Sequence, residues 1–145
     1  MATYSIGQLA KQLGCTSQAL RYYEEEGLIP PPVRTEGNQR RYGEQHLQRL
    51  LFIRHGRELG FSLEAITELL QLAAHSEQPC VKADEIARAQ LQQVRSRIAR
   101  LKALETELAS MVEQCGCDTV AHCKVIEVLQ DHHLCHHDHA VSDPV

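Results

Sequence analysis

The chain has 145 residues, of which 43% are hydrophobic and 4% aromatic, with no Trp and a net charge of −4. This length suits one domain, or a small domain with an oligomerisation element, and no apolar run is long enough to span a membrane. The amino-terminal segment lacks the charged and apolar regions of a signal peptide, so we expect a cytoplasmic protein with no membrane partner.

Charge and cysteine content indicate two separate roles along the chain. Residues 1–60 carry 8 Lys and Arg against 6 Asp and Glu, whereas residues 61–145 carry 7 against 13. A basic first part can meet nucleic acid although the whole chain is acidic. In a cytoplasmic protein the six cysteines are better explained as metal ligands or redox thiols than as disulfides.

Two short helices separated by a turn are predicted at the start of the chain. Apolar residues recur at helical spacing over residues 5–13, and Ser5 with Gln8 has the spacing of a capping box. Gly14 ends this helix, and Thr16 can cap the next one. A helix, a short turn and a second helix are typical of a helix-turn-helix motif.

The second of these helices carries the groups that DNA recognition needs. Ser17, Gln18 and Arg21 lie in its first turns, where they can reach base edges and phosphates in a major groove. Arg21 is followed by Tyr22 and Tyr23, which supply hydroxyl groups, and we expect one of the two rings to be structural. The helix is therefore predicted to be a recognition helix.

A basic β-hairpin is predicted next. The run Glu24–Glu26 is expected to be a solvated helix end, and Pro30–Pro32 cannot continue a helix. Gly37 and Asn38 form a strong hairpin-turn signal. The residues that flank this turn are Arg34, Arg40, Arg41 and Tyr42. A hairpin with this basic rim can act as a wing that touches phosphates.

Four further helices are predicted. One spans about residues 43–59, and Ser62 caps another that runs to about Leu72. From Val81 to about Glu113 the chain contains neither Gly nor Pro, which predicts one long helix. A short helix follows in "KVIEVLQ".

The long helix carries an apolar seam with a period of 3.5 residues, as in a coiled coil. The seam residues are Ala87, Leu91, Val94, Ile98, Leu101, Leu108 and Val112. An amphipathic helix packed on its own domain is the alternative. We favour the coiled coil because the helix is long and little chain remains to cover it. Antiparallel pairing of two subunits would place the start of one helix near the end of the other.

The order of these elements resembles that of the MerR-family transcriptional regulators. Their winged helix-turn-helix is matched by "IGQLAKQLGCTSQALRYYEEEGLIPPPVRTEGNQRRY", and their second helical pair by "HLQRLLFIRHGRELGFSLEAITELL". The resemblance covers residues 4–72 closely and continues to about residue 130. It implies a mostly α fold: a winged helix-turn-helix DNA-binding domain, a long dimerisation helix in an antiparallel coiled coil and a C-terminal metal-binding loop.

The resemblance also implies a function. A homodimer of this family binds double-stranded promoter DNA with an overlong spacer, and its effector makes it bend and untwist that DNA so that RNA polymerase can start. A metal-resistance or efflux promoter would suit the cysteines, and an enzyme is not expected, because no open pocket with a nearby base is evident. By resemblance, the DNA contacts are Arg21, Tyr23, Arg34, Asn38, Arg40, Tyr42 and Arg57.

A cluster of soft ligands follows the long helix. Cys115 and Cys123 bracket a loop that contains Cys117 and His122, and Cys80 directly precedes the helix. Thiolates select soft metals such as copper(I), zinc, cadmium and lead, or iron–sulfur clusters. In an antiparallel pair, Cys80 of one subunit would approach the loop of the other, which gives a site with ligands from both chains.

Several effectors fit these cysteines. Cys80 matches the position used by zinc-, cadmium- and lead-responsive relatives, so a divalent ion of this group is favoured. A copper(I) regulator is the alternative, since Cys115 and Cys123 alone could hold that ion. An iron–sulfur redox sensor ranks third, because the position of its fourth cysteine is Val112.

The chain ends in a histidine-rich tail, which could form a second metal site or act as a nonspecific scavenger. Its candidate ligands are His132, His133, Cys135, His136, His137 and His139. The expected divisions of the chain are a DNA-binding domain (1–75), a connector (76–80), a dimerisation helix (81–113), a metal-binding loop with a short helix (114–131) and the tail (132–145).

Overall fold

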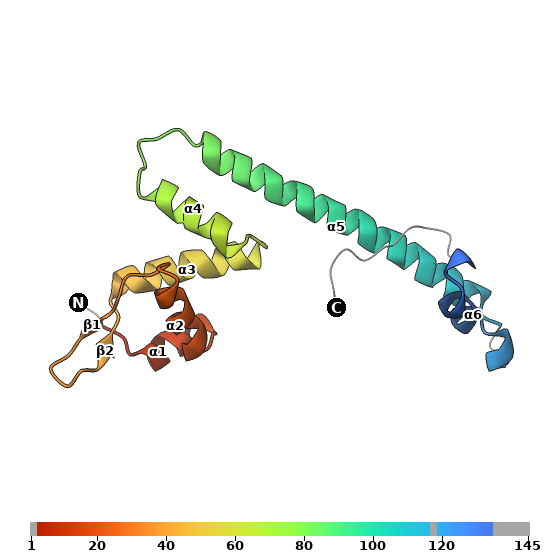
Figure 1. Ribbon diagram of the computed structural model, residues 1–145, viewed down its shortest axis with the longest axis horizontal. Coiled ribbons are helices and arrows are strands. Elements are labelled where there is room, and N and C mark those ends of the chain that lie inside the picture. The colour runs from red at the N-terminus through yellow and green to blue at the C-terminus, as the bar shows by residue number, and fades with distance from the viewer. Residues whose placement is uncertain (1–2, 117–118, 135–145) are drawn as a thin grey trace. The chain divides into compact units, whose positions relative to one another are not determined.

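The structure, a computed structural model, describes residues 3–116 and 119–134, and the chain divides into two compact units at residues 86 and 87. The elements are α1 (Ile6–Leu13), α2 (Ser17–Glu25), β1 (Val33–Arg34), β2 (Arg40–Arg41), α3 (Glu44–Glu58), α4 (Leu63–Ala73), α5 (Val81–Gln114), the 3-10 turn η1 (Val120–His122), α6 (Lys124–Gln130) and the 3-10 turn η2 (His132–Leu134) (Figure 1). The predicted mostly α fold with a winged helix-turn-helix is confirmed. Among the helices of the described part, none combines the length and apolar character needed to cross a membrane.

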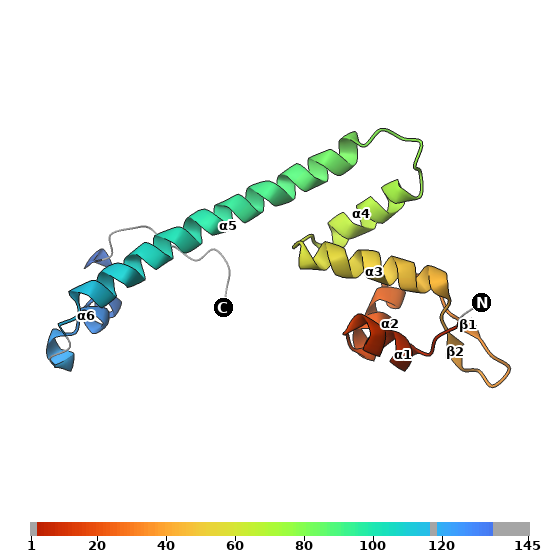
Figure 2. The ribbon, with the colours of Figure 1, turned by 180° about the vertical axis from the view of Figure 1, so that it is seen from behind.

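Helix α3 is the centre of the N-terminal unit. Helices α1 and α2 pack together, and both α1 and α4 contact α3. Figures 1 and 2 show α1 and α2 on one side of α3, α4 on the other, and the hairpin beside the N-terminal end of α3. The recognition helix and the wing thus belong to one compact unit with α3 at its centre.

The helix boundaries follow from local capping. Ser5 Oγ accepts the Gln8 N–H at 3.2 Å, and Gln8 Oε1 accepts the Ser5 N–H at 2.8 Å, which completes the predicted capping box. Thr16 Oγ1 accepts the Ala19 N–H at 3.1 Å and so starts α2. Gly14 ends α1 with a φ of +66°, a conformation that costs other residues more.

The wing is a two-stranded antiparallel hairpin, as predicted, with Arg34 opposite Arg40. In its turn the Asn38 N–H donates to the Thr35 carbonyl at 2.8 Å, and the Thr35 N–H donates to the Gln39 carbonyl at 2.9 Å. Asn38, with a φ of +60°, adopts the left-handed conformation in the Gly37-Asn38 pair. This is a three-residue loop with a bulge, for which Asn is among the favoured residues.

A close approach between α3 and α4 gives a stability prediction. A Cβ at Gly56 would lie 2.8 Å from Cγ1 of Ile66, a side chain that is itself fully buried. We expect Gly56→Ala to be destabilising, because overpacking costs about 1–3 kcal/mol, more than the about 0.5–1 kcal/mol that Ala gains within a helix. Denaturant unfolding measures the difference.

The matched control is Gly7→Ala in α1, where the nearest atom to the added Cβ would be Ser5 Oγ at 4.0 Å. This control should leave stability unchanged or raise it. A Gly56→Ala protein as stable as the Gly7→Ala protein would contradict close packing at the α3–α4 contact.

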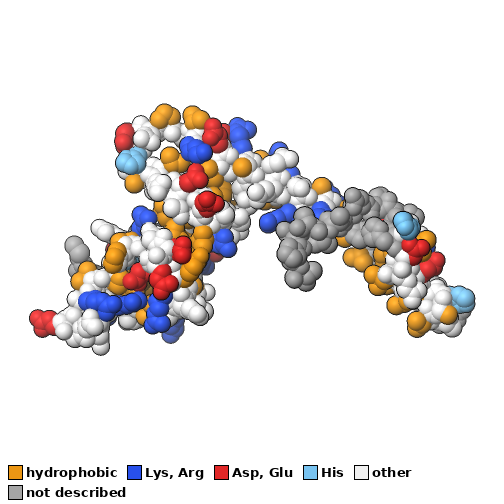
Figure 3. Space-filling view, viewed as in Figure 1, with side chains coloured by type: hydrophobic (Ala, Val, Ile, Leu, Met, Phe, Trp, Pro, Cys, Tyr) orange, Lys and Arg blue, Asp and Glu red, His pale blue; other side chains and the backbone are white. Residues whose placement is uncertain are grey.

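The second unit contains most of α5, a helix of 34 residues, and α6. The first turn of α5 belongs to the N-terminal unit, where Lys82 Nζ lies 4.0 Å from Glu68 Oε2. The seam is open in the single chain, with Ile98 46%, Leu101 63% and Val112 71% exposed. Figure 3 shows hydrophobic side chains at the surface near the C-terminal end of α5, and Figures 1 and 2 place α6 beside that end.

Candidate nucleic-acid interface and metal centre

Helix α2 presents the predicted recognition residues at its start. Thr16 caps the helix, and the side chains of Gln18 and Arg21 are exposed, whereas Ser17 is half-buried. Gln18 can donate and accept hydrogen bonds, and Arg21 adds a cation, so this end of the helix offers both base and phosphate contacts. Their contacts with DNA remain predictions.

The two tyrosines of α2 differ in environment. Tyr22 is exposed, whereas Tyr23 is half-buried and packs against the core. The centroids of the two tyrosine rings lie 6.0 Å apart. The predicted contact between the Tyr23 hydroxyl group and DNA remains a prediction.

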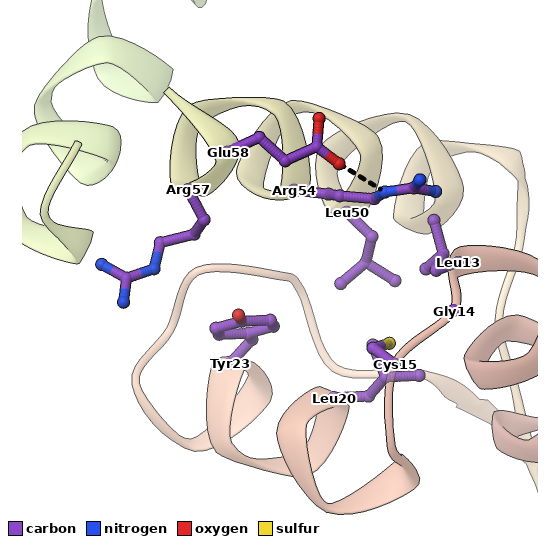
Figure 4. Close-up of a pocket in the computed structure, with 9 residues that line it drawn as sticks. All are labelled: Leu13, Gly14, Cys15, Leu20, Tyr23, Leu50, Arg54, Arg57 and Glu58. Carbon is purple, nitrogen blue, oxygen red and sulfur yellow. Dashed lines mark hydrogen bonds and ion pairs between the residues drawn. The ribbon is translucent and has the colours of Figure 1, made fainter. Parts of the chain in front are cut away.

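Tyr23 lines a pocket of about 450 Å3 beneath α3 (Figure 4). The apolar side of the pocket is formed by Leu13, Leu20 and Leu50 with Cys15. Arg54 and Arg57 extend from α3 toward opposite ends of it, and Arg54 Nε donates to Glu58 Oε1 at 3.0 Å. The structure thus brings Tyr23 and Arg57, two predicted phosphate contacts, to one pocket.

Arg54 was not predicted as part of this surface. A signal was present in the sequence, because residues three apart on a helix share a face and Arg54 precedes Arg57 by three. Arg57 Nη1 donates to the Phe61 carbonyl at 3.1 Å, which leaves further N–H groups for a phosphate.

Cys15, at the turn between α1 and α2, packs within the DNA-binding unit and is not one of the candidate metal ligands. Its side chain packs against the core, and burial raises the pKa of the Cys15 thiol against the opposing effect of the Arg54 guanidinium. A thiol held in its protonated form behaves as a small hydrophobic group.

The wing holds its tip in place by internal contacts. Arg34 Nη1 donates to the Asn38 carbonyl at 3.3 Å and to Asn38 Oδ1 at 3.2 Å. Both side chains are exposed. Arg34 and Asn38 are therefore adjacent at the surface, where both remain predicted DNA contacts.

The prediction that Tyr42 contacts DNA is wrong for its side chain. Tyr42 is 0% exposed, its backbone pairs with Tyr4, and its hydroxyl donates to Glu24 Oε2 at 3.2 Å. Burial and the adjacent Glu24 carboxylate raise the pKa of Tyr42, so the hydroxyl stays protonated and remains a donor. A buried ring cannot reach a phosphate, and Tyr42 supports the wing from within the core.

The other candidate site lies after α5. The side chains of Cys115 and Cys123 are both half-buried, and His122, beside Cys123, is exposed. Turn η1 and the hydrogen bond from the Cys123 N–H to the Val120 carbonyl at 3.2 Å hold this segment, and Cys123 directly precedes α6. Cys117 lies outside the described residues.

Cys80 occupies the opposite end of α5. Its side chain is exposed, and its carbonyl accepts the Asp84 N–H at 2.9 Å, so it forms the N-terminal boundary of the helix. Helix α5, with 34 residues, is about 50 Å long at 1.5 Å per residue. Cys80 and Cys115 flank this length of continuous helix.

Within residues 3–116 and 119–134, no three His, Cys, Asp or Glu side chains lie close enough together to hold a metal ion. In the tail, His132 and His133 belong to η2, and the His133 side chain is exposed. The remaining tail candidates, Cys135, His136, His137 and His139, lie outside the described residues. A second metal site stays a prediction.

The chain matches known proteins along most of its length. The family described as "MerR HTH family regulatory protein" matches residues 4–73, and the one described as "MerR, DNA binding" matches residues 47–111. The HTH-type transcriptional regulator ZntR of Escherichia coli K12 is 42% identical over 131 residues, which span 88% of this chain and 92% of that protein.

Solved structures agree with these matches. The transcription regulator PbrR691 from Ralstonia metallidurans CH34, in complex with lead(II), has a TM-score of 0.73 and 41% identity, covering 87% of this chain and 98% of that one. HiNmlR, a MerR family regulator bound to promoter DNA, has a TM-score of 0.57 and 26% identity, covering 77% of this chain and 85% of that one. The chain belongs to the MerR family of helix-turn-helix transcriptional regulators.

Proposed function

We propose that the chain is a homodimeric transcriptional activator that senses a soft divalent metal ion, with cadmium, lead and zinc as the candidates. In this proposal, Cys80 of one subunit and Cys115 and Cys123 of the other bind the ion. The relatives support a metal effector, since PbrR691 was solved with lead(II) and shares 41% of its sequence with this chain.

The arrangement of cysteines about α5 is the observation that carries the proposal. Because about 50 Å of helix separates Cys80 from Cys115, the two join one site most simply if an antiparallel partner supplies one of them. The exposed seam of α5 offers the surface for that partner. Antiparallel pairing then brings each helix start to the other helix end.

The donor set fits a soft divalent ion. Three sulfurs suit cadmium or lead, and the exposed His122 could supply the nitrogen that zinc also accepts. Cys115 directly follows α5, and Cys123 lies within nine residues of the end of that helix, so a change in the spacing of these cysteines would act on the end of α5. The thiolates of Cys115 and Cys123 alone would suit copper(I). Cys80 is therefore the residue that distinguishes a divalent effector from copper(I).

The proposed output is a change in DNA shape. If the ion binds one dimer geometry more tightly than another, it shifts the population toward that geometry. The two winged units would then hold the promoter bent and untwisted, in a form that RNA polymerase can use. The wing and the recognition helix belong to one compact unit, so a movement of that unit would carry both DNA-binding elements together.

A metal titration of the reduced protein tests this proposal. Cadmium(II), lead(II), zinc(II) and copper(I) are added while ultraviolet thiolate-to-metal absorption and transcription from a bound promoter are both recorded. We expect a divalent ion to raise both signals with the same midpoint. Copper(I) as the strongest inducer would contradict the divalent assignment, and a promoter response to none of the ions would contradict metal sensing.

A further inference from the structure

Glu24, near the end of the recognition helix, differs from its acidic neighbours in its burial. The run Glu24–Glu26 has the composition of a solvated helix end, and Glu25 and Glu26 are indeed exposed. The Glu24 side chain is only 19% exposed. A carboxylate turned inward on a DNA-binding helix requires an explanation, because it opposes phosphate binding.

One oxygen of this carboxylate joins the recognition helix to the wing. Glu24 Oε2 accepts Nη1 of Arg40 at 3.4 Å and the hydroxyl of Tyr42 at 3.2 Å. Arg40 lies in β2, and Tyr42 is the first residue after that strand. Glu24 therefore contacts both the basic rim of the wing and its buried base.

The buried base is itself held from several directions. The Tyr42 N–H donates to the Tyr4 carbonyl at 2.9 Å, and the Tyr4 N–H donates to the Tyr42 carbonyl at 2.7 Å. The edge of the Tyr42 ring meets the His46 ring at 89°, with centroids 5.3 Å apart. Tyr42 is thus a fixed point to which Glu24 is attached.

His46 ties this point to the proline segment. Its Nδ1 accepts the Gly43 N–H at 3.0 Å, so the ring proton is on Nε2, which donates to the Pro30 carbonyl at 3.0 Å. The neutral ring satisfies both partners while only 7% exposed. His46 therefore connects the segment before the wing, at Pro30, to the segment after it, at Gly43.

We propose that Glu24 is a positioning residue for DNA binding, which holds Arg40 and the wing in a fixed orientation to the recognition helix. This inference rests on the proposed function. Arg40 is half-buried at 34% exposure, and without its carboxylate partner it loses the contact that sets its direction. The recognition helix and wing would then have to be aligned on DNA at an additional entropic cost.

The sign of one measurement separates this role from plain electrostatics. Glu24→Gln removes a negative charge near DNA, which by charge alone should tighten binding, because the repulsion of the phosphates is lost. A positioning role predicts the opposite: binding about tenfold weaker, with a salt slope shallower by about 1, because Arg40 no longer makes its contact. Glu25→Gln is the matched control, with the same change of charge at an exposed neighbour.

The probe is a fluorescent duplex selected by the wild-type dimer from a random-sequence pool, titrated at several salt concentrations. Weaker binding by Glu24→Gln together with equal or tighter binding by Glu25→Gln supports the proposal. Binding by Glu24→Gln as tight as wild type, or tighter, overturns it. Failure of the wild-type dimer to select any duplex would overturn the proposed function and this inference together.

Thermal unfolding followed by circular dichroism verifies that each variant folds. If Glu24→Gln does not fold, Tyr42→Phe replaces it in the test, because the ring stays in the core and only the hydroxyl that anchors Glu24 is lost. We expect weaker DNA binding by Tyr42→Phe, with full folding. Wild-type affinity in that variant would overturn the positioning role.

Discussion

Replacing Cys115 with Ser is expected to abolish the transcriptional response to metal while promoter binding persists. Cys115 lies in the C-terminal unit, and the candidate DNA contacts lie in the N-terminal unit. Loss of a thiolate ligand should lower metal affinity by more than the about 10- to 100-fold that follows the loss of a group supporting a ligand. Isothermal titration measures the metal affinity, and transcription from the promoter in the presence of metal measures the response.

Cys123→Ser should behave in the same way, and Cys15→Ala is the matched control. Cys15 packs against the core of the DNA-binding unit, so its removal should leave metal affinity unchanged. Wild-type induction in both the Cys115→Ser and Cys123→Ser proteins would remove these residues from the metal site.

Two charges placed in the seam of α5 are expected to separate the dimer. Ile98→Lys with Leu101→Lys would bury two ammonium groups between the helices, at a cost of several kcal/mol for each charge. Sedimentation should then report a monomer. Promoter affinity should fall steeply, because each monomer carries one recognition helix and wing and can contact one half-site.

The control carries the same added charge on the opposite face of α5. Ala89→Lys with Ser96→Lys changes two exposed residues that lie outside the seam, so the dimer should remain. A dimeric Ile98→Lys, Leu101→Lys protein would show that α5 does not supply the subunit contact.

The helices of the N-terminal unit could be predicted from sequence because their signals are local. Ser5, Thr16 and Ser62 each cap a helix with a hydrogen bond to a residue three positions later. The hairpin was predictable for the same reason, although the turn uses Asn38 for the positive φ. Such signals depend on a few consecutive residues and need no knowledge of packing.

The roles of Tyr42 and Glu24 were not predictable in this way. Tyr42 stands two residues after Arg40 in an extended segment, and residues two apart in a strand lie on the same face. The sequence pattern therefore groups Tyr42 with the basic rim and does not reveal its burial. Its burial arises from pairing with Tyr4, and Glu24 meets the wing across 16 to 18 positions of sequence. Contacts at that separation are decided by tertiary packing.

For the metal loop, the ligand types could be predicted from the sequence, but the proposed arrangement of these ligands needs a second chain. Cys80 and Cys115 flank the two ends of α5, so the proposed site depends on a second copy of the chain. The spacing of Cys115, His122 and Cys123 is typical of a soft-metal site, whereas the proposed coordination geometry depends on how two subunits meet.

A mixed dimer tests the central claim, that one ion is bound by sulfurs from two subunits. One chain carries Cys80→Ser and the other carries Cys115→Ser with Cys123→Ser, each with a different purification tag. The mixed dimer then retains one complete set of ligands, with Cys80 from the second chain and the loop cysteines from the first. We predict that it binds one ion with wild-type affinity while both parent homodimers bind poorly. A mixed dimer that binds no better than its parents, or a Cys80→Ser homodimer with wild-type affinity, would contradict a shared site.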